Sequence, residues 1–230
     1  MTAGVTTTSG TFALAGQDVS TILDRPADAR VVLALAHGAG AGMRHAFMDA
    51  LAAALVARAV AVLRYQFPYQ EAGRRRIDPP ALLEATVVRA VQAARQEAPE
   101  LPLFAGGKSM GGRMTSRAAA AHAWRAAAEP GVRGLVFFGF PLHPAKRPAT
   151  ERAAHLSAVR LPMLFLQGTR DDLADRKLIR EVTALLPLAR LHVIEGADHG
   201  FHVLKRSGRT DAQVLDELAD AAVAWMVEQL

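Results

Sequence analysis

The chain has 230 residues and no cysteine, and this absence excludes several kinds of chemistry. Without thiols there is no disulfide framework, no thiolate nucleophile and no thiolate metal site. No apolar run approaches the roughly 20 residues that a membrane helix requires. The first ten residues also lack the basic segment and apolar core of a signal peptide. We therefore expect a cytoplasmic protein without a membrane partner.

Acidic residues are fewer than basic ones, which leaves a net charge of +5. The tightest basic run, Arg74–Arg76, is short and contains no interleaved aromatic residues. A nucleic-acid surface needs a longer basic stripe, so we interpret this run as a solvated loop and predict no nucleic-acid partner. Apolar residues make up 51% of the chain and charged residues 21%, which is typical of a folded globular protein.

Continuous apolar runs alternate with helical patterns along most of the chain. Continuous hydrophobicity is typical of parallel strands that are buried on both faces. The predicted strands are 31–36, 60–67, 103–105, 133–139, 162–167 and 191–194, with one or two more between Thr11 and Leu23. The predicted helices are 45–59, 78–96 with Asp78 as its cap, 109–127, 173–185 and 211–228, the last capped by Thr210 or Asp211. This alternation predicts a single α/β domain over residues 1–230, with a mostly parallel sheet and helices on both faces.

The motif Gly107-Lys-Ser109-Met-Gly111 lies between a predicted strand and a predicted helix. That order is typical of a serine exposed on a sharp strand-to-helix turn, where glycines permit close packing of the backbones. A phosphate-binding loop ending in Gly-Lys-Ser would need glycine at position 102, which is Pro102. The motif alone does not separate a nucleophile from a turn without chemistry, so the other groups of the site must decide.

The loop His37–Gly42 follows the first buried strand and is rich in glycine and alanine. A dinucleotide-binding fingerprint would need glycine at Met43 or His45 and is therefore absent. We expect a backbone N–H from Ala39, or alternatively Gly40, to form an oxyanion hole with the N–H of Met110. The alternative is a tight loop whose small residues serve packing only.

Two further loops supply an acid and a base beyond the strand ends, where parallel sheets collect reactive groups. Asp171 follows the strand 162–167 and is the predicted acid, with Asp172 as the alternative; both could instead cap the following helix. His199 follows the last strand between flexible residues and is the predicted base, whereas His202 is interpreted as structural. The order Ser109, Asp171, His199 is the order that the α/β-hydrolase sheet imposes.

With these residues in place, the chain resembles the α/β-hydrolase superfamily. It is most similar to a small dienelactone-hydrolase-like group related to the testis-expressed and histone-acetyltransferase-complex-associated hydrolase-like proteins. The resemblance is carried by Leu35–Gly42, Phe67–Tyr69 with Arg74–Arg76, Ala105–Arg113, Gly139–Leu142, Leu166–Asp171 and Gly196–His199. It implies the α/β-hydrolase fold, a Ser109/Asp171/His199 triad and no cofactor or metal. True dienelactone hydrolases use a cysteine nucleophile, so their particular activity is not implied for Ser109.

The sequence thus predicts a serine hydrolase that cleaves a small ester-like substrate, a carboxylester or thioester, through an acyl-enzyme. The connection from Pro141 to Leu161 allows at most one short helix near 150–159, so we expect no cap or a minimal one. The expected pocket is open, suits small or exposed acyl groups, and is bordered by Tyr69, Met110, Phe140, Leu142 and Phe201.

Three points stay open at this level. The same residues fit acyl transfer or perhydrolysis, and a hydrolase fold can also serve as a non-catalytic interaction module. Lys108 beside the serine could attract an anionic substrate, but we expect a salt bridge to a neighbouring carboxylate. The sequence gives no indication of oligomeric state.

Overall fold

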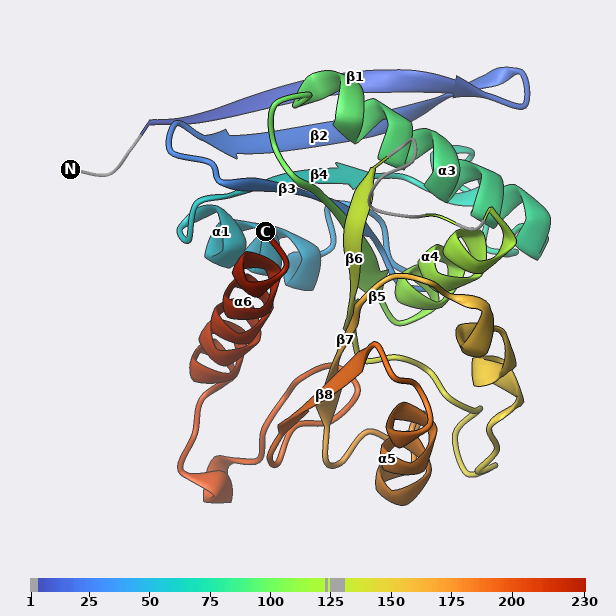
Figure 1. Ribbon diagram of the computed structural model, residues 1–230, viewed down its shortest axis with the longest axis vertical. Helices are drawn as coiled ribbons and strands as arrows, with labels where there is room; N and C mark the ends of the chain where they lie inside the picture. Colours follow the sequence, from blue (N-terminus) through green and yellow to red (C-terminus); the bar gives the residue numbers. More distant parts are fainter. Residues whose placement is uncertain (1–3, 123, 125–130) are drawn as a thin grey trace.

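The computed structural model describes residues 4–122, residue 124 and residues 131–230. A single eight-stranded sheet runs through it in the order β1-β2-β4-β3-β5-β6-β7-β8 (Figure 1). The parallel part consists of β3 (Val31–Ala36), β4 (Val60–Tyr65), β5 (Leu103–Lys108), β6 (Val132–Phe138), β7 (Met163–Gly168) and β8 (Ala189–Ile194). β5, which leads into Ser109, lies near the centre of this part. The predicted mostly parallel sheet is confirmed.

An antiparallel hairpin extends the sheet at the β4 edge. It consists of β1 (Val5–Leu14) and β2 (Gln17–Pro26), which is longer than the one or two short strands predicted between Thr11 and Leu23. The turn residues Ala15 and Gly16 both have positive φ, as a two-residue type I′ hairpin turn requires. β1 is exposed along nearly its whole length, so its sequence lacks the apolar alternation that marks a half-buried strand.

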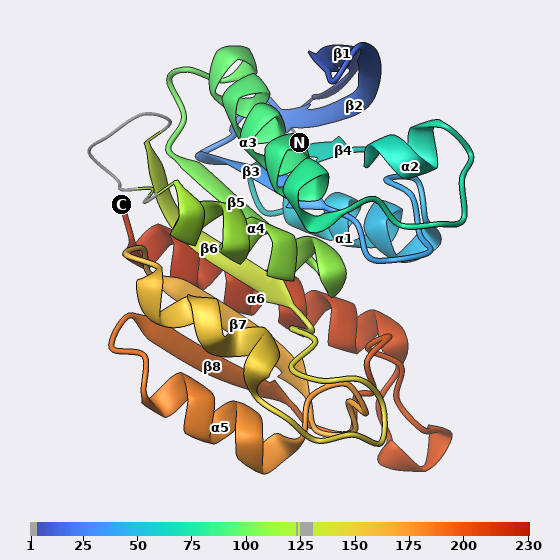
Figure 2. The same ribbon diagram turned by 90° about the vertical axis from the view of Figure 1, so that its right-hand side faces the viewer.

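Helices cover both faces of the sheet and bury two separate apolar clusters (Figure 2). One face packs against α1 (Ala46–Val56) and α6 (Asp211–Glu228). The other face packs against α3 (Pro80–Glu97), α4 (Met110–Ala121), α5 (Arg176–Ala184) and the 3-10 helix η1 (Glu151–Ala158). Two short elements, α2 (Pro68–Glu71) and η2 (Lys205–Ser207), lie in the connections after β4 and before α6.

Helix starts agree with the sequence in one case and differ in two. Thr210 caps α6 through a capping box with Gln213, as predicted. Asp78 does not cap α3, because Pro79 holds the cap position and Asp78 instead accepts a 2.8 Å hydrogen bond from Arg74. α5 begins at Arg176 rather than near 173, since Asp175 is its cap. α4 ends at Ala121 with His122 as its C-cap, before the predicted end near 127. Residues 123 and 125–127 of the predicted helix lie outside the described residues.

The connection between β6 and β7 leaves the strand ends uncovered. Residues 141–161, all of which the structure describes, hold η1 as their only helix, and η1 lies against α4. The Ser116 hydroxyl and His155 Nε2 join the two at 2.7 Å. The predicted absence of a cap is therefore confirmed. Among the helices of the described residues, none is long and apolar enough to cross a membrane.

Candidate active site

Ser109 occupies a strained turn between β5 and α4. Its φ of 51° and ψ of −117° are sparsely populated for a residue with a side chain, and such a conformation costs about 1–3 kcal/mol. The surrounding backbones are very close, because a Cβ on Gly107 would lie 2.7 Å from a backbone atom of Gly111. A Cβ on Gly111 would lie 2.6 Å from the carbonyl oxygen of Ala36. The packing that holds Ser109 above the sheet therefore requires both glycines.

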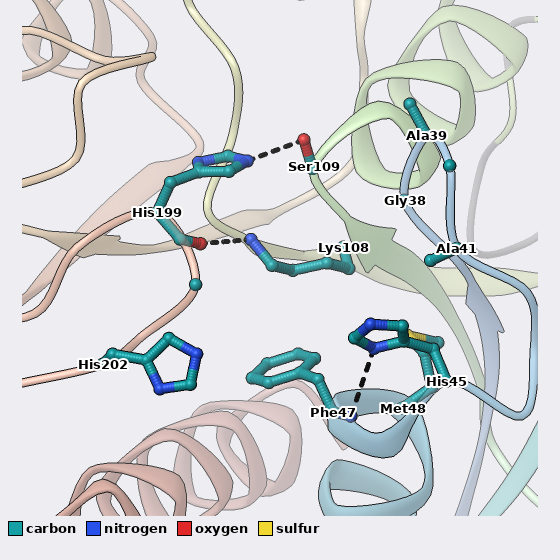
Figure 3. Close-up of a pocket in the computed structure, with 12 residues that line it drawn as sticks. Gly38, Ala39, Ala41, His45, Phe47, Met48, Lys108, Ser109, His199 and His202 are labelled. Carbon is teal, nitrogen blue, oxygen red and sulfur yellow. Dashed lines mark hydrogen bonds between the residues drawn. The ribbon is translucent and has the colours of Figure 1, made fainter.

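A continuous set of hydrogen bonds joins Ser109, His199 and Asp171. Ser109 Oγ lies 2.8 Å from His199 Nε2 (Figure 3). His199 Nδ1 lies 2.7 Å from Asp171 Oδ2. The Asp171 carboxylate is an acceptor only, so the imidazole carries its proton on Nδ1 and accepts from the serine hydroxyl at Nε2. The three residues come from the ends of β5, β7 and β8, and the fold brings them to one edge of the sheet.

Asp171 is fixed by further donors. Its side chain is wholly buried, and its Oδ1 accepts the N–H of Leu173 at 2.8 Å. The Gln167 amide donates to Oδ2 at 2.5 Å while its own oxygen accepts the N–H of Phe140. Asp172, the alternative acid, is exposed, and the partner of His199 Nδ1 is Asp171. Asp175 caps α5, so the alternative prediction that Asp171 and Asp172 both cap the following helix is wrong.

Gly139, at the end of β6, leaves room for the group above it. It has a φ of +70°, and a Cβ added there would lie 3.0 Å from Lys108 Nζ. The same Cβ would lie 3.5 Å from His199 Cε1 and 3.6 Å from Asp171 Oδ2. The side chains of Lys108, His199 and Asp171 therefore all lie close to Gly139, where a larger residue would crowd them.

Lys108 forms the floor of the pocket and does not make the expected salt bridge. Its ammonium donates a hydrogen bond to the backbone carbonyl of His199 (Figure 3). It also lies 5.0 Å and 5.7 Å from the ring centroids of Phe201 and Phe47. Within the described part of the chain, no ion pair joins it to a carboxylate. Burial lowers its pKa to about 8, and the charges of Asp171 and Asp198 oppose that change. A lysine adjacent to Ser109 in sequence therefore also holds the backbone of His199.

The loop after β3 presents backbone N–H groups beside Ser109. The buried His37 fixes this loop, since its Nε2 accepts the N–H of Phe67 at 3.1 Å and its Nδ1 lies 2.8 Å from the Gly38 carbonyl oxygen. Burial lowers the pKa of His37 to about 4, so the ring is neutral and donates from Nδ1. In the planar peptide the N–H of Ala39 points opposite to the Gly38 carbonyl. No hydrogen bond to a described residue occupies the N–H of Ala39 or of Met110.

A pocket of about 250 Å³ opens beside Ser109 (Figure 3). It is lined by the loop 38–41, by Lys108, Ser109, His199, Gly200 and His202, and by three residues of the α1 start, His45, Phe47 and Met48. Sequence reasoning missed the last three, although they directly follow the glycine-rich loop. Their position at the first turn of a helix, just after a loop at a strand end, could have predicted that they line the pocket.

None of the five residues predicted to border this pocket is among its lining residues. Tyr69, Phe140 and Leu142 are fully buried in the core and are not among the lining residues. Tyr69 stacks on Phe67 with ring centroids 6.5 Å apart, and Phe140 packs between Phe137 and Phe165. The Phe140 and Leu142 side chains belong to the apolar cluster under the strand ends, whereas the Tyr69 hydroxyl is buried beside Gly40, outside the pocket lining. A position after a strand does not reveal this difference. Met110 is half-buried, and Phe201 lines a neighbouring groove.

The sheet order, the strained serine turn and the uncovered strand ends define a lidless α/β-hydrolase fold. A family model described as alpha/beta hydrolase domain matches residues 28–227, and the chain belongs to this family.

Solved structures share the whole fold at low sequence identity. A dienelactone hydrolase from Anabaena variabilis is 19% identical with a TM-score of 0.73, over 97% of this chain and 98% of that one. A serine hydrolase without a lid from Xanthomonas campestris is 20% identical with a TM-score of 0.72, over 95% and 94%. A cold-adapted esterase from an Arctic intertidal metagenomic library is 18% identical with a TM-score of 0.68, over 98% and 94%. These likenesses concern the fold.

Proposed function

We propose that the protein is a serine hydrolase that cleaves a small carboxylester or thioester through an acyl-enzyme. The observation that carries this proposal is the unbroken hydrogen-bonded series from Ser109 through His199 to Asp171, whose serine end faces an open pocket. The similarity to an esterase and to lidless serine hydrolases agrees with it. So does the narrower resemblance to the dienelactone-hydrolase-like group that the sequence motifs suggest.

In the proposed reaction Ser109 attacks the carbonyl carbon of the ester while His199 Nε2 takes the hydroxyl proton. The imidazolium that forms is stabilised by Asp171, which also keeps Nδ1 protonated and the ring in position. The tetrahedral intermediate then collapses as His199 gives its proton to the leaving oxygen or sulfur. Water, activated by the same histidine, hydrolyses the acyl-enzyme and restores Ser109.

The negative oxygen of the intermediate needs donors, and the N–H groups of Ala39 and Met110 fit that role. Both belong to backbone beside Ser109, and both lack a partner among the described residues. Met110 is the first residue of α4, so the positive end of the helix dipole also favours an anion there. One such donor contributes about 3–4 kcal/mol to transition-state stabilisation. Gly40 remains the alternative donor of the loop.

The decisive experiment compares the wild type with Ser109→Ala on a panel of esters that vary in acyl length and charge. We expect kcat to fall about a millionfold in the variant. A fluorophosphonate probe should label the wild type at Ser109 and leave the variant unlabelled. An ester that both proteins cleave at equal rates, or an unlabelled wild type, would contradict the proposal and favour a non-catalytic module.

A further inference from the structure

A second cavity adjoins the Ser109 pocket. We call it the α1–α6 groove because it lies between the starts of these two helices, which run side by side on one face of the sheet (Figures 1 and 2). Its volume is about 460 Å³, larger than the pocket at Ser109. The two cavities share four lining residues, namely His45, Phe47, Gly200 and His202. The groove is therefore continuous with the candidate active site.

The groove is apolar along its length. Phe47 and Phe201 line it with stacked rings whose centroids lie 5.8 Å apart, and Leu215 and Leu218 line it as well. Its flanks on both helices are alanines, and these small side chains leave the space open: Ala46, Ala50 and Ala212.

The polar groups of the groove are already engaged with one another. His202 and Asp211 form an ion pair at the rim with 2.7 Å between Nδ1 and Oδ2. His45 Nδ1 accepts the N–H of Phe47 at the start of α1. A ligand in the groove therefore meets carbon atoms and paired polar groups, and an unpaired charge of its own would not be matched there.

We propose that the α1–α6 groove binds an apolar group of the substrate, a hydrocarbon chain or aromatic ring, while the scissile carbonyl lies at Ser109. This inference rests on the proposed hydrolase function and extends it to a substrate class. The pocket at Ser109 alone is below the roughly 300–1,000 Å³ of most small-molecule sites, whereas the groove extends it into that range. Because the alanine flanks are exposed, the bound group lies in an open channel and not in a covered tunnel.

The position of Phe201 connects the groove with the reaction. Phe201 follows His199 by two residues, is buried, and has a φ of 66°, which few residues with side chains adopt. The backbone that carries the base thus also carries a wall of the groove. An apolar group that packs on Phe47 and Phe201 lies next to the atoms that react at Ser109.

The test uses two ester series on the full chain. One series lengthens the acyl group from acetate to hexanoate with a fixed leaving group, and the other lengthens the alcohol of an acetate ester. We expect kcat/KM to rise about twofold to fourfold per added methylene in one series, because each buried methylene contributes its transfer free energy. The series that shows the rise identifies the part of the ester that the groove binds. Flat profiles in both series would overturn the inference.

Variants locate the effect. Ala212→Phe and, independently, Ala50→Phe fill the groove from opposite helices and should abolish the rise with chain length, measured in each variant relative to its own rate on the acetate ester. The matched control is Ala224→Phe, the same change at an exposed alanine of α6 outside the groove, which should keep the rise. A rise that persists in both groove variants, with thermal unfolding unchanged, would also overturn the inference. Labelling of Ser109 and turnover of the acetate ester report separately on the proposed hydrolase function.

Discussion

The two walls of the Ser109 pocket are built in different ways. One wall, which we call the sheet-edge wall, consists of Ser109 and His199 with the buried Asp171 behind them, all held by strand ends and hydrogen bonds. The other, the helix wall, consists of His45, Phe47 and Met48 from α1, which make mainly apolar contacts. Hydrogen bonds with fixed geometry leave few alternatives to a side chain, whereas apolar contacts tolerate changes of shape. We therefore expect the first wall to govern rate and the second to govern which ester is preferred.

Lys108 is the residue that joins the two walls. It precedes Ser109, donates to the backbone of His199 and lies over the faces of Phe47 and Phe201. A shift of the helix wall can therefore move the backbone of His199 through the Lys108 side chain. The predictions below probe the sheet-edge wall, then this link, then the rim of the helix wall.

The largest effect is expected within the sheet-edge wall. Asp171→Asn should lower kcat about ten-thousandfold, because the amide stabilises neither the required tautomer nor the imidazolium. Asp172→Asn is the matched control and should change kcat less than about twofold, since the Asp172 side chain is exposed. Steady-state kinetics on one ester measure both. Equal losses in the two variants would contradict the assignment of the acid.

An intermediate effect is expected at the link between the walls. Lys108→Met should lower kcat about tenfold to a hundredfold, because His199 loses the donor that fixes its backbone and small misplacements of reacting groups are costly. Lys108→Arg, which keeps the charge and the donors, should recover part of this loss. Lys205→Met serves as the control at an exposed lysine. If Lys108→Met kept the full wild-type kcat, the link would have no role in positioning.

The pH dependence distinguishes positioning from simple packing. The kcat of the wild type should fall as pH rises through about 8, where Lys108 loses its proton and its charge-assisted bond. Asp171, Asp198, His199 and His202 also face this ammonium, so the test is the difference between variants. The alkaline fall should be absent in Lys108→Met and shifted upward in Lys108→Arg.

Stability should respond to pH in the opposite sense at this residue. The folded-state pKa of Lys108 lies below its unfolded value, so the unfolded chain binds more protons between these two values. Linkage then makes the Lys108 contribution to the free energy of unfolding rise with pH over that range. Chemical denaturation of the wild type and of Lys108→Met should show this contrast.

The smallest effect is expected at the rim of the helix wall. Asp211 raises the pKa of His202 chiefly through their hydrogen bond, so the pair is stabilising when His202 is protonated. This contribution is complete below the unfolded pKa of about 6.5 and is lost as pH rises through the folded value. For an exposed pair we expect His202→Gln to lower the free energy of unfolding by about 0.5 kcal/mol or less near pH 5. Thermal unfolding should show no difference from wild type near pH 8.

The sheet-edge wall could be predicted from the sequence because each of its residues lies in the loop or turn that follows an apolar strand. The chain order of strands fixes where their ends meet, so Ser109, Asp171 and His199 could be placed together before any coordinates. The role of Gly107 and Gly111 in the serine turn could be predicted in the same way, since the close approach of the backbones excludes residues with a side chain.

The helix wall could not be predicted in the same way. Whether an aromatic residue near a strand end points into the core or into the pocket depends on the local backbone path, as the buried Phe140 and the pocket-lining Phe47 show. The partner of Lys108 was missed because it is a backbone carbonyl, which no side-chain pattern reveals. Asp78 was predicted to cap α3 because it precedes two prolines. The sequence pattern did not show that Arg74 would bind the Asp78 carboxylate instead.

The conformation of Ser109 places stability and activity in conflict at one position. Glycine would adopt its positive φ without strain, so a chain selected only for resistance to unfolding would lose the serine there. A chain selected for turnover must keep it and tolerate a less stable turn. Stability-driven redesign of this protein should therefore hold position 109 constant and seek its gains far from the serine turn, for example along the exposed β1–β2 hairpin.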